Sequence, residues 1–151
     1  MQEFLPYAWF EGKCIPFKDA KVSIATHALH YGTAAFGGMR AIPNPSNKDE
    51  FLLFRTDKHI KRLSQSARLL LTEISEEYIF NALKTILKKN KPTKPIYIRP
   101  FVYTSDLGIA PRLHNIETDF FIYCIELGDY LSPDGVSCRM SSWTRQEDRS
   151  L

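Results

Sequence analysis

Two neighbouring segments with the period of amphipathic helices, set between groups of strand-like runs, constrain the fold of this chain more than any other feature. One segment begins at Thr56 and the other at Ser75, and apolar residues recur in both at spacings of three and four. The order of strands, two helices and then strands predicts an α+β fold rather than a doubly wound sheet. We expect a two-layer sandwich, with a mainly antiparallel sheet and the two amphipathic helices on one face.

Strand-like runs fill much of the remaining chain. Turn-forming residues separate them, and Glu11-Gly12-Lys13 joins the first two runs as a hairpin. The run at 120–125 is apolar enough for a central strand. The predicted strands are 8–10, 14–17, 22–24, 51–54, 96–103, 120–125 and 136–142.

The composition is typical of one globular domain. Of the 151 residues, 44% are hydrophobic, which is enough for a core. The formal charge of +3 is spread along the chain, so we expect no nucleic-acid partner. No apolar run approaches the length of a membrane span and the N-terminus has no leader pattern, so we expect no membrane contact and a cytoplasmic protein.

Two segments contain the candidate site residues. The segment HALHYGTAAFGGMR, from His27 to Arg40, combines small residues, aromatics and an arginine that a surface loop does not need. In the run Tyr97-Ile98-Arg99-Pro100, a period of two puts Tyr97 and Arg99 on one face. A phenol beside a guanidinium suits a carboxylate, which predicts a pocket for an amino acid or an oxo acid. The alternative for Arg40 and Arg99 is an ordinary exposed charge.

Other common chemistries lack their sequence patterns. The chain has no P-loop, no GxGxxG, no CxxC and no Ser-His-Asp arrangement. His27 and His30 are three residues apart, but no third ligand lies at a useful spacing, so we expect packing or capping roles and no metal site. Reasoning from the residues alone therefore ends at the acid-binding pocket.

At this point the chain resembles a known family, the branched-chain amino-acid aminotransferases. The similar segments are HALHYGTAAFGGMR, HIKRL (59–63), YIRP (97–100), LGDYL (127–131) and SSWTRQEDRS (141–150). The resemblance implies the small N-terminal domain over residues 1–141 and the start of an interdomain linker over 142–151. It also implies pyridoxal 5'-phosphate as cofactor, fold type IV, and a homodimer or larger homo-oligomer. The reaction implied is transamination of leucine, isoleucine and valine with 2-oxoglutarate.

The resemblance also assigns roles to individual residues. Arg62 matches the arginine that contacts the cofactor phosphate, and Tyr97 matches the tyrosine that helps hold the substrate carboxylate. Arg99 matches the arginine that accepts the distal carboxylate of glutamate. The other matches are Phe36 and Tyr130 in the pocket wall, Tyr31 reaching the neighbouring subunit's site, and Arg40 near the substrate entrance.

Three departures from the family pattern bear on function. Gly37 stands where many members have glutamate, and Leu127 where some have tryptophan, so substrate breadth is less defined than the reaction. The family's Schiff-base lysine lies beyond Leu151, with the large cofactor-binding domain, so we expect this chain to be inactive alone. The alternatives are another fold type IV aminotransferase or lyase, and a non-catalytic carboxylate-binding module.

Overall fold

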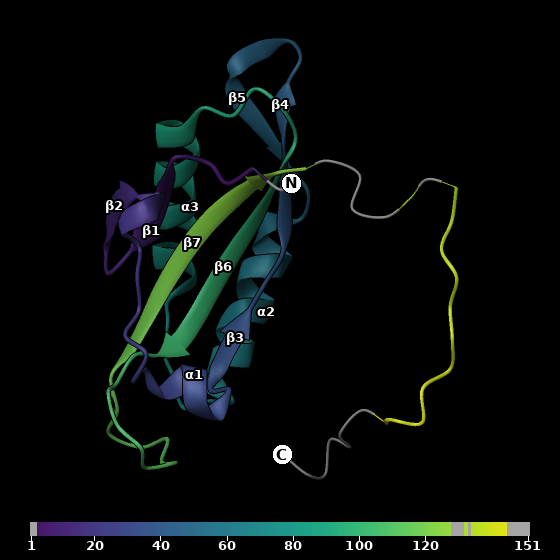
Figure 1. The fold of residues 1–151 in the computed structure, drawn as a ribbon. Coiled ribbons are helices and arrows are strands. Elements are labelled where there is room, and N and C mark those ends of the chain that lie inside the picture. The colour runs from purple at the N-terminus through teal and green to yellow at the C-terminus, as the bar shows by residue number, and fades with distance from the viewer. Residues whose placement is uncertain (1–2, 128–131, 133, 145–151) are drawn as a thin grey trace.

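An antiparallel sheet with helices on one face forms the body of the chain (Figure 1). The computed structural model describes residues 3–127, 132 and 134–144. The strand order is β2-β1-β7-β6-β4-β5, and β3 pairs with β6. The strands are β1 (Tyr7–Phe10), β2 (Lys13–Pro16), β3 (Ala34–Phe36), β4 (Met39–Asn44), β5 (Asn47–Leu53), β6 (Ile96–Thr104) and β7 (Thr118–Glu126). The helices are η1 (Phe17–Asp19), α1 (His27–Tyr31), α2 (Thr56–Arg68) and α3 (Glu76–Asn90). The predicted α+β sandwich is confirmed.

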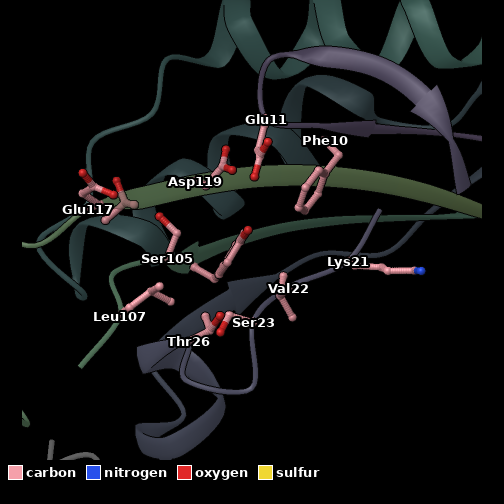
Figure 2. A pocket seen from close by; sticks show the side chains of 12 residues that line it. Phe10, Glu11, Lys21, Val22, Ser23, Thr26, Ser105, Leu107, Glu117 and Asp119 are labelled. Atoms are coloured by element: carbon pink, nitrogen blue, oxygen red, sulfur yellow. The ribbon is translucent and has the colours of Figure 1, made fainter. Parts of the chain in front are cut away.

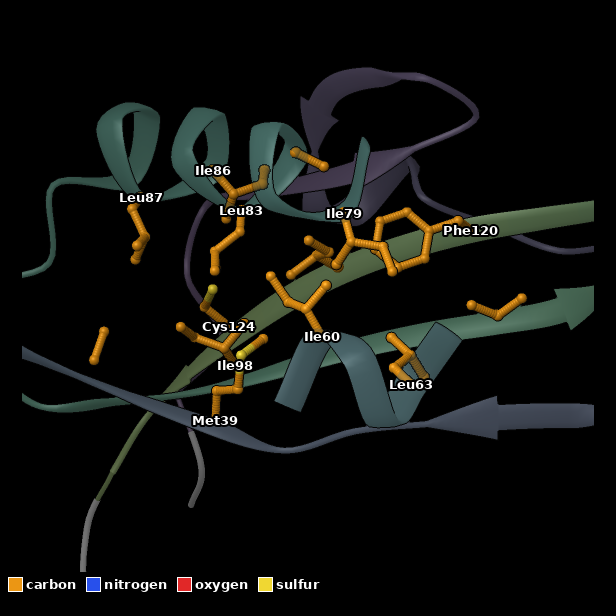
Figure 3. Close-up of a cluster of buried hydrophobic side chains, with 14 of the residues drawn as sticks. Met39, Ile60, Leu63, Ile79, Leu83, Ile86, Leu87, Ile98, Phe120 and Cys124 are labelled. Carbon is orange, nitrogen blue, oxygen red and sulfur yellow. The ribbon is translucent and has the colours of Figure 1, made fainter. Parts of the chain in front are cut away.

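The core lies between the sheet and the helices α2 and α3 (Figure 3). Ser75 caps α3, because its side chain accepts a hydrogen bond from the backbone N–H of Tyr78 at 3.1 Å. The apolar residues of both helices recur once per turn, so each helix buries one stripe against the sheet. The fully buried side chains include Leu63, Ile79, Leu83, Ile86, Ile96, Ile98 and Ile122. None of the helices in the described part is long and apolar enough to cross a bilayer.

The central strands β6 and β7 separate the core from a second face of the sheet. Along β6, Ile96 and Ile98 are buried against the helices, while Tyr97 and Arg99 alternate with them and are only half-buried. This is the predicted division of the strand into a core face and a polar face. We call the sheet surface opposite α2 and α3 the open face.

β3 and β4 act as two halves of one strand beside β6. Phe36 pairs with Phe101 in β3, and Met39 pairs with Ile98 in β4. Between them, the N–H of Gly37 donates to the carbonyl of Pro100 at 3.0 Å. Pro100 has no N–H to return that bond, so the ladder is interrupted at Gly37-Gly38.

The sequence prediction differs from the structure in several details. Residues 22–24 and 136–142 form no strand, because a strand needs a partner and the structure pairs neither segment with one. The helix α2 begins at Thr56, as expected, but its cap is Arg55, in the left-handed region at φ 52° and without a side-chain cap hydrogen bond. The strands β3 and β4 were not predicted, because Gly37-Gly38 between them and Pro43 in β4 conceal the alternation.

Candidate functional site

The open face brings four of the predicted site residues together. Tyr97 and Arg99 lie on β6, and Arg40 is the cross-strand partner of Tyr97. Phe36 is the cross-strand partner of Phe101, so it lies diagonal to Arg99 on the same face. Arg40 and Phe36 are exposed to solvent, and Tyr97 and Arg99 are half-buried. Two arginines and a phenol therefore share one aromatic surface.

Arg99 is held by aromatic rings rather than by acids. Its Cζ lies 4.4 Å from the ring centroid of Phe36 and 5.1 Å from that of Tyr97. Its side chain makes no ion pair or hydrogen bond with any residue the structure describes, and its buried Nε has no partner. An arginine whose donors are unused is ready to bind an anion.

Two residues without side chains separate Tyr97 from Arg62. A Cβ atom on Gly38 would clash with the Oη of Tyr97 and would lie 2.9 Å from its Cε2 and Cζ. A Cβ atom on Gly37 would lie 3.8 Å from Nη2 of Arg62 and 3.3 Å from Cγ of Pro100. Tyr97 lies against one side of the Gly37-Gly38 backbone, and Arg62, from α2, lies against the other side.

The close approach of Tyr97 to Gly38 predicts a cost for any side chain there. Gly38→Ala should lower the free energy of unfolding by about 1–3 kcal/mol, because the tyrosine ring must move out of a packed position. Urea unfolding of the chain measures this. In a Tyr97→Ala background the same change should cost less than about 0.5 kcal/mol.

Gly108→Ala is the matched control, because a Cβ on Gly108 meets no atom within 4 Å. It should change stability by less than about 0.5 kcal/mol. An equal cost of Gly38→Ala with and without Tyr97 would contradict the contact.

Arg62 is exposed on α2 and is available to a ligand. It makes no ion pair or hydrogen bond within the described ranges of the chain, where the ion pairs are Lys58 with Asp57 and Lys94 with Glu126. Its guanidinium lies beside the backbone of Gly37. The N–H of Gly37 is already bonded to the carbonyl of Pro100, so the guanidinium of Arg62 is the group here that can hold a phosphate or a carboxylate.

Tyr31 lies at the opposite end of β6 from Tyr97. Its hydroxyl donates to the carbonyl of Ile109, and its ring contacts His27. His27 is buried and bonds Thr104, the last residue of β6, at 3.0 Å. From Tyr97 to Thr104 the strand spans roughly 23 Å, so Tyr31 is not part of the Tyr97–Arg99 group. The predicted site residue Tyr130 lies outside the described residues.

His27 has a structural role, as expected. Its Nε2 donates to the carbonyl of Ala110 at 3.0 Å, because a carbonyl can only accept. Its Nδ1 lies 2.9 Å from Oγ1 of Thr33. The histidine thereby joins α1 to the loop at 105–117.

A pocket of about 590 Å³ opens at the Thr104 end of the sheet (Figure 2). Glu11, Glu117 and Asp119 line it, with Lys21 on the side away from Glu117. Burial, and then the charge of Glu11, raise the pKa of Asp119, while a hydrogen bond from the N–H of Phe120 opposes them. The pocket contains none of the predicted site residues, and its acidic lining does not suit a carboxylate ligand.

Comparison with known proteins identifies relatives of the whole chain. The family model described as amino-transferase class IV matches residues 35–151. A probable branched-chain-amino-acid aminotransferase of Synechocystis sp. is 62% identical over 151 residues, which are 100% of this chain and 50% of that protein. A protein of the same name from Aquifex aeolicus is 38% identical over 97% of this chain and 48% of its own length. The chain thus spans about half the length of these relatives.

Solved structures share the fold. The branched-chain amino acid aminotransferase of Escherichia coli has a TM-score of 0.83 at 31% identity, covering 94% of this chain and 48% of its own. A second branched-chain amino acid aminotransferase, from T.th. and complexed with N-(5'-phosphopyridoxyl)-L-glutamate, has a TM-score of 0.81 at 30% identity, covering 97% and 48%.

Proposed function

This chain belongs to the class IV aminotransferase family, and from that premise we propose that it supplies the substrate-binding half of a pyridoxal-phosphate-dependent enzyme. The proposed reaction exchanges the amino group of leucine, isoleucine or valine with 2-oxoglutarate. The observation that supports it most is the unpaired guanidinium of Arg99 beside the phenol of Tyr97 on an aromatic surface. Such a surface can accept both a carboxylate and a branched apolar side chain.

The proposal gives each residue of the open face a task. Tyr97 donates its hydroxyl proton in a hydrogen bond to the substrate carboxylate, and Arg99 binds the distal carboxylate of 2-oxoglutarate with paired N–H donors. Phe36 offers apolar surface to the branched side chains and helps to exclude water. Arg40, exposed beside Tyr97, attracts anionic substrates toward the entrance.

The residues around Gly37 fit the phosphate of the cofactor. Arg62 is exposed, has no acidic partner among the described residues, and lies against a backbone that has no side chain. We propose that Arg62 holds the phosphate group there. When bound, pyridoxal phosphate supplies the electron sink for the reaction. The solved T.th. relative holds a phosphopyridoxyl glutamate, which supports the same cofactor here.

We propose that the lysine that attaches the cofactor is not among these 151 residues. Lys94 precedes β6, but its ammonium is bound to the carboxylate of Glu126 at 2.7 Å. That hydrogen bond, and then the negative charge of Glu126, raise the pKa of Lys94, which favours the protonated form over the free amine that attacks a carbonyl. Lys84, Lys88 and Lys89 are exposed on α3.

The proposal also includes a homo-oligomer. Tyr31 lies far along β6 from Tyr97, so it cannot serve the same pocket within one chain. We propose that it reaches the pocket of a neighbouring subunit. The alternatives are another class IV aminotransferase or lyase, and a carboxylate-binding module without catalysis.

The first experiment compares the 151-residue chain with the complete polypeptide that joins it to a lysine-bearing domain. We expect transamination of leucine with 2-oxoglutarate by the complete polypeptide and none by the chain alone. Activity of the chain alone would overturn the account of the lysine. A preference of the complete polypeptide for D-alanine would favour the other aminotransferases, and inactivity with all donors would favour the binding module.

The cofactor role of Arg62 has its own test. Arg62→Gln should weaken pyridoxal phosphate binding by the complete polypeptide about 10- to 100-fold, because a charge-assisted contact to phosphate is lost. A titration of the cofactor absorbance measures this without any turnover. Lys61→Gln, the exposed neighbour on α2, should change the dissociation constant by less than about twofold. Equal effects of the two variants would contradict a specific contact.

A further inference from the structure

Among the residues that the structure describes, Phe36 has the ring that lies closest to the guanidinium of Arg99. We propose that Phe36 is a positioning residue, which holds Arg99 in one orientation so that its N–H donors are ready for a distal carboxylate. This inference rests on the proposed function for its consequence in catalysis. Its structural part, the immobilisation of Arg99 by Phe36, does not depend on any activity.

The surroundings of Arg99 leave few other groups to orient it. An arginine is usually fixed by hydrogen bonds to a carboxylate or a carbonyl, and Arg99 has none within the ranges that the structure describes. What remains is the attraction of the cation to two ring faces, Phe36 at 4.4 Å and Tyr97 at 5.1 Å. The rings direct the guanidinium without using its donors, which stay available to a ligand.

Phe36 is itself held by a row of stacked rings. It pairs across the strands with Phe101, with ring centroids 6.1 Å apart and planes at 5°. Phe101 stacks in turn on Phe121 at 4.7 Å and 7°. Phe36 is 54% exposed, so its burial adds little to the core. The row fixes the ring of Phe36, and the ring fixes the arginine.

This arrangement lets one surface accept two kinds of side chain. A guanidinium that is satisfied by ring faces can remain charged next to an apolar group, without a carboxylate that would repel 2-oxoglutarate. Without the ring of Phe36, Arg99 would have more rotamers, and a dicarboxylate would have to order it on binding. A substrate with one carboxylate does not bind Arg99 through a second carboxylate, so it would lose less binding free energy.

The structural test is an NMR measurement on the 151-residue chain. We expect the Nε–H signal of Arg99 to show an upfield ring-current shift and a rigid heteronuclear NOE. Phe36→Leu should reduce both toward the values of exposed Arg68, and Phe36→Tyr should retain both. Phe80→Leu, an exposed phenylalanine on α3, is the control and should change neither. An Arg99 signal that Phe36→Leu leaves unchanged would overturn the proposal, even if Phe36→Tyr folds poorly.

The kinetic test uses the complete polypeptide. Phe36→Leu should lower the ratio of kcat/KM for 2-oxoglutarate to kcat/KM for the 2-oxo acid of leucine about tenfold, and Phe36→Tyr should restore it to within about twofold. An equal fall for both oxo acids would make Phe36 a pocket wall only and would overturn its positioning role. If the unsubstituted polypeptide does not transaminate, the proposed function fails, while the NMR result still decides whether Phe36 immobilises Arg99.

Discussion

Replacing Arg99 with leucine should lower kcat/KM for 2-oxoglutarate about 100-fold in the complete polypeptide. The variant removes a charged, two-pronged contact to the distal carboxylate, a loss of about 3 kcal/mol. The fall for the 2-oxo acid of leucine should be much smaller, because that substrate has no second carboxylate. Steady-state kinetics with both oxo acids measures the difference.

Stability distinguishes this loss from damage to the fold. Arg99 has no acidic partner in the described part of the chain, so its removal leaves no buried charge unpaired. Arg99→Leu should therefore change the free energy of unfolding by less than about 1 kcal/mol. Arg68→Leu, in the exposed last turn of α2, is the control. It should leave kcat/KM unchanged for 2-oxoglutarate and for the 2-oxo acid of leucine. Equal losses for both oxo acids would contradict the assigned role.

Truncating Ile98 should destabilise the 151-residue chain by about 3–4 kcal/mol. Its side chain is 0% exposed and lies in the core between β6 and the helices (Figure 3). Alanine removes apolar contacts and leaves a cavity that the central strand β6 cannot close, because β4 and β7 hold it on both sides. Urea unfolding measures the change, with the slope checked for a constant two-state transition.

Ile24→Ala is the matched control, since Ile24 is 86% exposed and belongs to no helix or strand. We expect a change of less than about 0.5 kcal/mol. A similar cost at the two positions would mean that the packing of β6 against the helices does not dominate stability.

The sequence predicted correctly those helices and strands whose pattern lies within their own residues, and it failed where a strand depends on a distant partner. The helices α2 and α3 and the strand β6 were predicted from their own periodicity, and β7 from its continuous apolar run at 120–125. The segments at 22–24 and 136–142 alternate apolar with polar residues but form no strand, since pairing depends on a distant partner. β4 was missed for the opposite reason, because its partner β6 stabilises a segment that reads as irregular.

The same distinction applies to the candidate site. The sequence by itself determined that Tyr97 and Arg99 share a face, because a strand repeats every two residues. Only the tertiary structure decided that Phe36 lies on Arg99, that Arg62 meets Gly37, and that Tyr31 is at the other end of β6. These contacts join segments that are distant in sequence, so they depend on strand register and on how α2 packs against the sheet. No local period contains that information.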